Sequence, residues 1–214
     1  MNIEQKLNDI SEIKSMMEKS SKFLSLSGLS GVFAGSIALI GAIVVFFKFE
    51  SVYSIRYGLG QVQKGSPYQF DDSSAFIVFA FVTGLIVLIL ALLSGFYFTY
   101  RKAQKLGLPL SSVVAKKLVI NLSIPLITGG LLALILAYHH VFYLIAPVTL
   151  IFYGLALVNA STYTLRDIRY LGLLEIGLGL ISAVYIGYSL IFWALGFGIL
   201  HIIYGISMYL KYDR

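Results

Sequence analysis

Six long runs of apolar residues alternate with short polar segments along this chain. About 20 apolar residues of helix span the ~30 Å core of a bilayer, so each run can form a membrane-crossing helix. We place these helices at residues 24–47, 75–98, 118–138, 141–160, 171–186 and 190–209. The fifth run is short, and its helix is expected to begin earlier, at Ile168. The pattern predicts an all-α fold, a polytopic membrane bundle of six transmembrane helices.

Residues 1–22 have a different pattern. They are polar, with apolar residues at helical spacing that include Ile3, Leu7, Ile10 and Met17. This spacing predicts an amphipathic cytoplasmic helix, followed by one transmembrane domain over residues 23–214. The helix could lie on the membrane surface or the bundle. Alternatively, it could pair with a second copy of the chain or with a partner protein.

Composition agrees with the membrane interpretation. The chain is 58% hydrophobic and 12% charged, whereas a soluble domain is about 25% charged. Its mean hydropathy is +0.88. We therefore expect the lipid bilayer to be its main partner.

The distribution of basic residues predicts the orientation. Of sixteen Lys and Arg residues, thirteen lie before the first predicted helix, in the second or fourth connection, or after the sixth helix. Only Lys48, Arg56 and Lys64 lie on the other side. The positive-inside rule then places both termini in the cytoplasm. This topology accounts for the net charge of +6, so no nucleic-acid partner is needed to explain it.

The sequence lacks cysteine and several common catalytic and cofactor-binding motifs. The chain has no cysteine, which excludes disulfides and thiolate chemistry. It contains no His-Glu-x-x-His, Walker or dinucleotide-binding motif. His139 and His140 fall in a predicted outer turn, where adjacent histidines are more often polar turn residues than metal ligands. We expect no cofactor, no metal and no enzymatic activity.

One short stretch of the sequence resembles a protease motif. Gly28-Leu-Ser30-Gly31 resembles the Gly-x-Ser-Gly motif of the rhomboid proteases, which have six core spans and a membrane histidine. Here Ser30 lies at the cytoplasmic start of the first span, and the second span has no His-x-x-x-Asn pattern. Serine-rich helix-packing faces produce such matches freely, so an intramembrane hydrolase is a distant alternative.

The candidate chemistry lies in the last two predicted helices. Glu175 is the one carboxylate within the long apolar stretches, and it lies thirteen residues before Tyr188 in the turn between them. His201 lies thirteen residues after Tyr188, so an antiparallel hairpin places the two side chains at the same depth. At 1.5 Å per residue, that depth is about 20 Å from the turn. An ionisable pair inside a membrane is a candidate functional site, and Tyr204 is a further candidate donor.

Glycines surround both ionisable residues at helical spacing. Gly172 and Gly179 flank Glu175, whereas Gly198 and Gly205 flank His201. Small residues let membrane helices approach closely, so the fifth and sixth helices are expected to pack on each other through these glycines. Gly31 and Gly35 form a similar face on the first helix. That face could pack inside the bundle or form a homodimer.

A proline inside the third predicted helix gives a further expectation. Pro125 removes the hydrogen bond to the carbonyl of Asn121, which a nearby polar side chain can replace. Asn121 and Asn159 lie equally far from the turn at His140, so they should lie at the same depth, near the cytoplasmic edge.

Two functional hypotheses remain. The first is a non-enzymatic integral membrane protein with a structural or regulatory role. The second is a small proton- or cation-coupled transporter or channel that uses Glu175 and His201. Residues 23–35 and 200–205, with Lys211-Tyr212, resemble an uncharacterised family of small six-span bacterial integral membrane proteins. That resemblance implies a multi-pass protein of the bacterial inner membrane and implies no activity.

Overall fold

The computed structural model describes residues 23, 26–57, 73–107 and 112–213, and all of its regular elements are helices. The amphipathic helix predicted for residues 1–22 lies outside these residues. The main helices are α2 (Gly28–Tyr57), α3 (Ser73–Leu106), α4 (Val113–Tyr138), α5 (Ile145–Ala160), α6 (Asp167–Val184), α7 (Ser189–Trp193) and α8 (His201–Tyr212). The short helices are η1 (Phe142–Leu144), η2 (Ser161–Tyr163), η3 (Ile186–Tyr188) and η4 (Ala194–Leu200).

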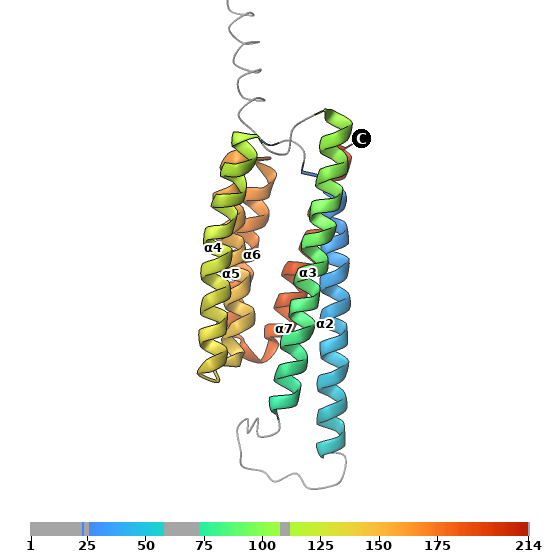
Figure 1. Cartoon of the computed structure of the whole chain (residues 1–214). Coiled ribbons are helices and arrows are strands. Elements are labelled where there is room, and N and C mark those ends of the chain that lie inside the picture. The colour runs from blue at the N-terminus through green and yellow to red at the C-terminus, as the bar shows by residue number, and fades with distance from the viewer. Residues whose placement is uncertain (1–22, 24–25, 58–72, 108–111, 214) are drawn as a thin grey trace, which may run out of the picture.

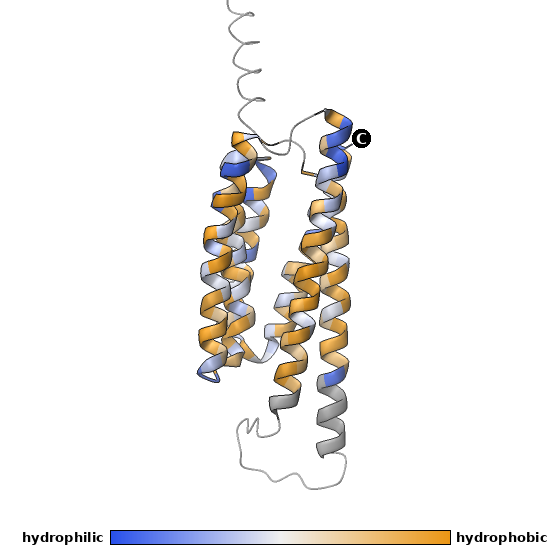
Figure 2. Ribbon diagram, viewed as in Figure 1, coloured by the Kyte–Doolittle hydropathy of each residue, from blue (hydrophilic) through white to orange (hydrophobic). Residues whose placement is uncertain are grey.

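Five of these helical segments are long and apolar enough to cross a membrane: Gly28–Lys48, Phe76–Leu106, Val113–Tyr138, Phe142–Tyr163 and Ile186–Tyr212. Their apolar residues cover most of each helix, and hydrophilic residues gather near the ends (Figure 2). This composition supports an integral membrane protein. The helix predicted around 171–186 is present as α6, but α6 also carries Asp167, Arg169 and Glu175. A sixth crossing therefore remains a prediction.

The helices pack as two groups of three (Figure 1). In one group, α2 packs along α3 and along the segment α7–η4–α8, which we call the last helix. In the other group, α5 lies between α4 and α6. The last helix also reaches across to α5 and α6, so it joins the two groups.

Glycines determine which helices come closest. A Cβ added at Gly35 would lie 2.6 Å from the carbonyl oxygen of Gly198, and one added at Gly31 would lie 3.1 Å from the Cα of Gly205. The backbones of α2 and the last helix can approach this closely only because neither carries a side chain there. The predicted glycine face of α2 thus packs inside the bundle.

The predicted glycine contact between α6 and the last helix is wrong. A Cβ at Gly172 would lie 2.7 Å from the Gly154 carbonyl oxygen, and one at Gly179 would lie 2.6 Å from the Ile151 side chain, so this face of α6 packs on α5. Gly198 and Gly205 face α2 instead. Each helix of the predicted hairpin packs its glycines on a different neighbour, and α6 touches the last helix much less than it touches α5.

Several predicted boundaries also need correction. The first helix begins at Gly28 rather than at residue 24 and continues to Tyr57, into the segment expected to be a loop. The fourth begins with the 3₁₀ turn η1. The last helix is not uniformly α-helical, because η4 is a π-helix of seven residues. A π-helix holds an extra residue per turn, which changes the direction in which the following side chains point.

The chain before α2 joins the two groups at one end of the molecule. The Phe23 side chain is buried against Ala115, Leu118 and Ala160 of the α4–α5 group. Its N–H donates to the carbonyl of Tyr163 at 2.7 Å, and its own carbonyl accepts from the hydroxyl of Thr164 at 2.8 Å. A neighbouring apolar cluster joins α5, α6 and α8, and its buried members are Leu157, Leu165, Ile168, Leu171 and Met208.

Candidate functional site

Glu175 lies on the most deeply buried stripe of α6. Buried residues recur at three- and four-residue spacing along this helix, and they are Ile168, Leu171, Gly172, Glu175, Gly179 and Ser182. The stripe exists because the glycines let α6 lie against α5 with little space between the backbones. Glu175 is 0% exposed, so its carboxyl group has no contact with solvent or lipid.

The structure brings His201 to this carboxyl group. The Nδ1 atom of His201 lies 3.3 Å from Oε1 of Glu175. His201 is the first residue of α8, directly after the π-helical segment η4, and is itself buried. Gly196, in η4, makes room for the contact, because a Cβ at that position would collide with Oε2 of Glu175. The sequence predicted the shared depth of the two residues but not the role of Gly196.

A third helix completes the site. The hydroxyl of Tyr153, on α5, lies 2.8 Å from Nε2 of His201. Phe197 packs against both rings, with its centroid 5.0 Å from that of Tyr153 and 6.0 Å from that of His201. The sequence suggested Tyr204 as the additional donor, but Tyr204 packs against the apolar cluster around Leu157.

Hydrogen bonding fixes the tautomer of His201. Its Nδ1 lies 2.9 Å from the main-chain carbonyl oxygen of Gly196. A carbonyl oxygen only accepts, so Nδ1 must carry a hydrogen and donate it. Nε2 is therefore the nitrogen that can be bare or protonated. When bare it accepts from the Tyr153 hydroxyl, and when protonated it donates to the same oxygen.

Glu175 lacks comparable partners. Among the described residues, neither of its carboxylate oxygens has a hydrogen-bond partner. An isolated ionised carboxylate in such surroundings is costly. The carboxyl group can avoid that cost by being protonated or by facing an imidazolium at 3.3 Å. The Ser182 hydroxyl, two turns along the same stripe, is also buried without a partner in this part of the chain.

The two asparagines predicted to lie at one depth are in contact. The side-chain amide of Asn159 donates to the main-chain carbonyl of Asn121 at 2.9 Å. That carbonyl is the one that Pro125 leaves without an intrahelical donor. The amide of Asn121 donates to the carbonyl of Lys117 at 2.8 Å, within its own helix. This hydrogen bond holds the segment of α4 around Pro125 against α5. It lies away from Glu175.

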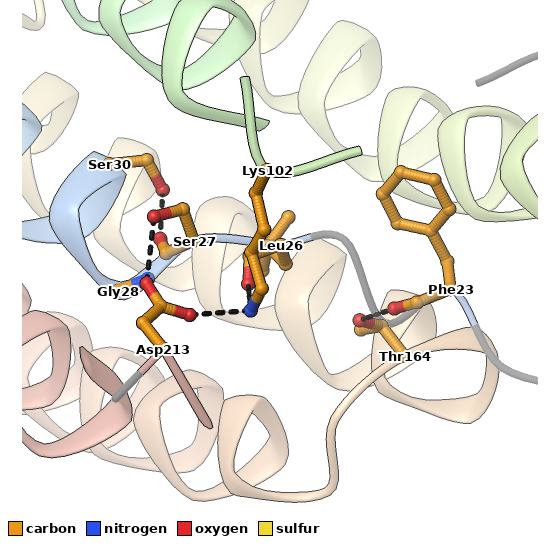
Figure 3. Close-up of polar contacts among 8 residues, drawn as sticks. All are labelled: Phe23, Leu26, Ser27, Gly28, Ser30, Lys102, Thr164 and Asp213. Atoms are coloured by element: carbon orange, nitrogen blue, oxygen red, sulfur yellow. Dashed lines mark hydrogen bonds and ion pairs between the residues drawn. The ribbon is translucent and has the colours of Figure 1, made fainter. Parts of the chain in front are cut away.

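Sequence reasoning missed a second polar cluster, which Figure 3 shows. The carboxylate of Asp213 accepts from the Ser27 hydroxyl at 2.8 Å and from the Gly28 N–H at 2.9 Å, at the start of α2. Its other oxygen pairs with Lys102 of α3, which also donates to the carbonyl of Leu26 at 2.8 Å. Residues 27, 102 and 213 come together only in the folded chain, so no local pattern could have revealed the cluster.

A further ion pair lies at the same end of the molecule. Lys211 donates to Asp167 at 2.8 Å, and the hydroxyl of Tyr212 donates to the same oxygen at 3.0 Å. The hydrogen bond from Lys211 holds the pKa of the Asp167 carboxyl below its ordinary value. This contact ties the start of α6 to the end of α8, but it is largely exposed and adds little stability.

Comparison of the chain with protein-family models, with curated proteins and with solved structures finds no match. The resemblance to a bacterial family therefore stays a prediction. Within the described ranges, no three His, Cys, Asp or Glu side chains gather as a metal site would require. The site is accordingly interpreted from its geometry alone.

Proposed function

We propose that this chain is a non-enzymatic integral membrane protein with a structural or regulatory role, and that Glu175, His201 and Tyr153 fasten α6 and α5 to the last helix. One observation carries this proposal. Glu175 is fully buried, and its carboxyl group faces His201 at 3.3 Å. A buried polar contact of this kind supports helix association inside a membrane.

The position of the contact supports a fastening role. The glycines of α6 face α5, and those of the last helix face α2, so the backbones of α6 and the last helix do not pack through them. The polar cluster supplies a specific link between the two three-helix groups at this depth. Without it, the last helix would contact α6 mainly through apolar side chains, which also pack well against lipid.

The fastening role is tested by two changes at Glu175. Glu175→Ala should lower the thermal stability of the purified protein in lipid nanodiscs, because it leaves a void beside His201. Glu175→Gln should keep the fold near neutral pH, because the amide has the same shape and fills the same space beside His201 without carrying a charge. A Glu175→Ala protein as stable as the wild type would refute the fastening role.

A second candidate function is a small proton- or cation-coupled transporter or channel. The observation that favours it is the absence of hydrogen-bond partners for both Glu175 oxygens among the described residues. In proteoliposomes, this hypothesis predicts a pH-dependent flux that Glu175→Gln abolishes, because an amide cannot titrate. Flux that is unchanged in the variant would exclude Glu175 as the coupling residue.

The remaining parts of the proposal concern the membrane. We infer a bacterial inner-membrane protein with six crossings, α6 included, and with both termini in the cytoplasm. The excess of Lys and Arg in the connections on one side supports this orientation. Residues 1–22 are proposed to bind a second copy or a partner protein. Deleting them should lower the oligomeric mass measured by light scattering, and an unchanged mass would contradict that assignment.

A further inference from the structure

We propose that Glu175, His201 and Tyr153 form a buried proton-binding site that holds one exchangeable proton, shared between the Glu175 carboxyl group and Nε2 of His201. This inference rests on the proposed pairing of Glu175 with His201. It identifies a proton as the ligand of this site. It also gives the pH range over which binding of that proton stabilises the fold.

The first step is the fixed hydrogen on Nδ1. The Gly196 carbonyl oxygen lies 2.9 Å from Nδ1 and can only accept, so this hydrogen stays in place whether His201 is neutral or charged. Any proton that His201 gains or loses must therefore be the one on Nε2. That atom faces the Tyr153 hydroxyl at 2.8 Å, so proton exchange at His201 passes by way of Tyr153.

The second step is the net charge of the cluster. With one exchangeable proton, the pair is either a neutral carboxylic acid beside a neutral imidazole or a carboxylate beside an imidazolium. Both arrangements have a net charge of zero. Removing that proton leaves a net negative charge beside a fully buried residue, and adding a second leaves a net positive charge. Either change places an uncompensated charge in a medium of low dielectric constant, which strongly destabilises the folded state.

The third step is the isolation of the cluster. α5 and the segment α7–η4 carry no charged residue. Within α2, which packs on η4 through Gly35 and Leu39, the first charged residue is Lys48, about 14 Å further along the helix axis. On α6, Asp167 is paired with Lys211 at the helix start, and Arg169 lies six residues before Glu175. No other charged group of the described elements packed around the cluster can neutralise an excess or missing proton.

Comparison with the unfolded chain gives the sign of the pH dependence. An exposed glutamate titrates near about pH 4.3 and an exposed histidine near about pH 6.5. Above about pH 6.5 the folded site holds one exchangeable proton and the unfolded pair holds none, so stability falls as pH rises. Between these two pH values the folded and unfolded states both hold one proton, so this pair contributes no pH dependence to stability. Below about pH 4.3 the unfolded pair holds two, so stability falls as pH falls.

The Glu175→Gln variant should behave differently. Its folded site is neutral with no exchangeable proton, so stability is constant above about pH 6.5 and falls below that value as the unfolded histidine binds a proton. From about pH 4.3 upward, the ratio of the wild-type folding constant to that of the variant should fall about tenfold per pH unit. Using this ratio cancels the contributions of all other titrating groups.

The experiment measures reversible unfolding of the full-length wild type and of Glu175→Gln in the same detergent micelles between pH 4 and 8. The expected result is the tenfold change in the ratio of folding constants for each pH unit. A ratio that does not change with pH would overturn the proposal, because it would mean that the folded site retains no proton.

A second measurement needs no change at Glu175. In a His139→Gln, His140→Gln background, His201 is the one histidine, and its two ring nitrogens can be followed by ¹⁵N NMR. Nδ1 should be protonated at every pH. The occupancy of Nε2, together with the Glu175 carboxylic-acid band in the infrared spectrum, should sum to one proton near neutral pH. A bare Nδ1, or a sum of zero or two, would overturn the assignment.

These results separate this inference from the proposed function. If Glu175→Ala destabilises the protein but the ratio of the wild-type and Glu175→Gln folding constants is independent of pH, the fastening role is supported and the proton site is refuted. If removing Glu175 has no effect on stability, the pairing itself is wrong. Tyr153→Phe supplies a further readout, because loss of the hydroxyl that accepts from protonated Nε2 should move the proton to Glu175 and increase the carboxylic-acid band. If Nε2 is protonated in the wild type, an unchanged band in that variant would contradict the role of Tyr153.

Discussion

Gly196 sets how closely the last helix approaches Glu175. Its lack of a side chain leaves the space that the Glu175 carboxyl group occupies, and its carbonyl oxygen fixes the hydrogen on Nδ1 of His201. One residue thus controls both the geometry and the protonation of the pair. The surrounding side chains of Leu150 and Phe197 are apolar, so the carboxyl group has few ways to relax.

Gly196→Ala should therefore destabilise the protein by roughly 1–3 kcal/mol, because the added methyl group overpacks a buried site. Thermal unfolding in nanodiscs measures this change. Gly177→Ala is the matched control, since Gly177 lies on α6 and nothing is within 4 Å of the position its Cβ would take. Equal stabilities of the two variants would contradict the packing described for Gly196.

Asn159 supplies a second prediction about a single residue. Asn159→Ala should cost about 1 kcal/mol, because the Asn121 carbonyl then loses its donor. Pro125→Ala restores a main-chain N–H to that carbonyl. In the Pro125→Ala background the Asn159→Ala change should therefore cost much less. If the cost is the same in both backgrounds, Asn159 does not replace the hydrogen bond that Pro125 removes.

Pairs of helices were harder to predict than single helices. The rise of a helix and the position of the turn gave the common depth of Glu175 and His201, and the same reasoning gave the common depth of Asn121 and Asn159. The rotation of each helix about its own axis was not predictable, because it depends on which neighbour receives the glycine face. The π-helical η4 makes the rotation of the last helix still harder to predict, because α-helical spacing does not hold between Ala194 and Leu200.

Tyr153 shows the same limit. It lies on α5, outside the predicted hairpin of the last two helices, and no spacing rule links it to His201. The sequence suggested Tyr204 instead, because it lies one turn from His201 on the same helix. Only the packing of α5 against the last helix decides between them.

The contact between α2 and the last helix yields a prediction about helix packing. Gly35→Ala should destabilise the protein by roughly 1–3 kcal/mol, because the new Cβ would lie 2.6 Å from a main-chain oxygen that cannot move aside. Gly84→Ala on α3 is the control, with nothing near its Cβ position. Reversible unfolding in detergent compares the two. A Gly35→Ala protein as stable as the control would mean that these backbones are further apart.

The described part of the chain consists of two three-helix groups joined at a few points. At one end, the Phe23 segment, the Asp167–Lys211 pair and the apolar cluster around Leu157 connect the groups. Asp213, Lys102 and Ser27 hold three segments of one group together at the same end (Figure 3). Deeper in the bundle, Glu175, His201 and Tyr153 form the polar link. The sequence predicted the helices of both groups, but it contained no sign that they are arranged in this way.

Membrane orientation can be tested because the chain has no cysteine. Single cysteines at Ser66 and His140 should react with an impermeant reagent added outside intact cells. Cysteines at Gln104 and Arg214 should react only after the membrane is opened, since the positive-inside rule places both in the cytoplasm. Reaction of the Arg214 position from outside would rule out the six-span topology.

The pairing of Glu175 with His201 underlies both proposals, and a double-mutant cycle tests it. Glu175→Ala and His201→Ala should each destabilise the protein in nanodiscs by roughly 1–3 kcal/mol, because each leaves a buried polar partner alone. The double variant should lose less than the sum of the two, with a coupling energy of about 0.5–3 kcal/mol. Strictly additive losses would show that the two side chains do not interact.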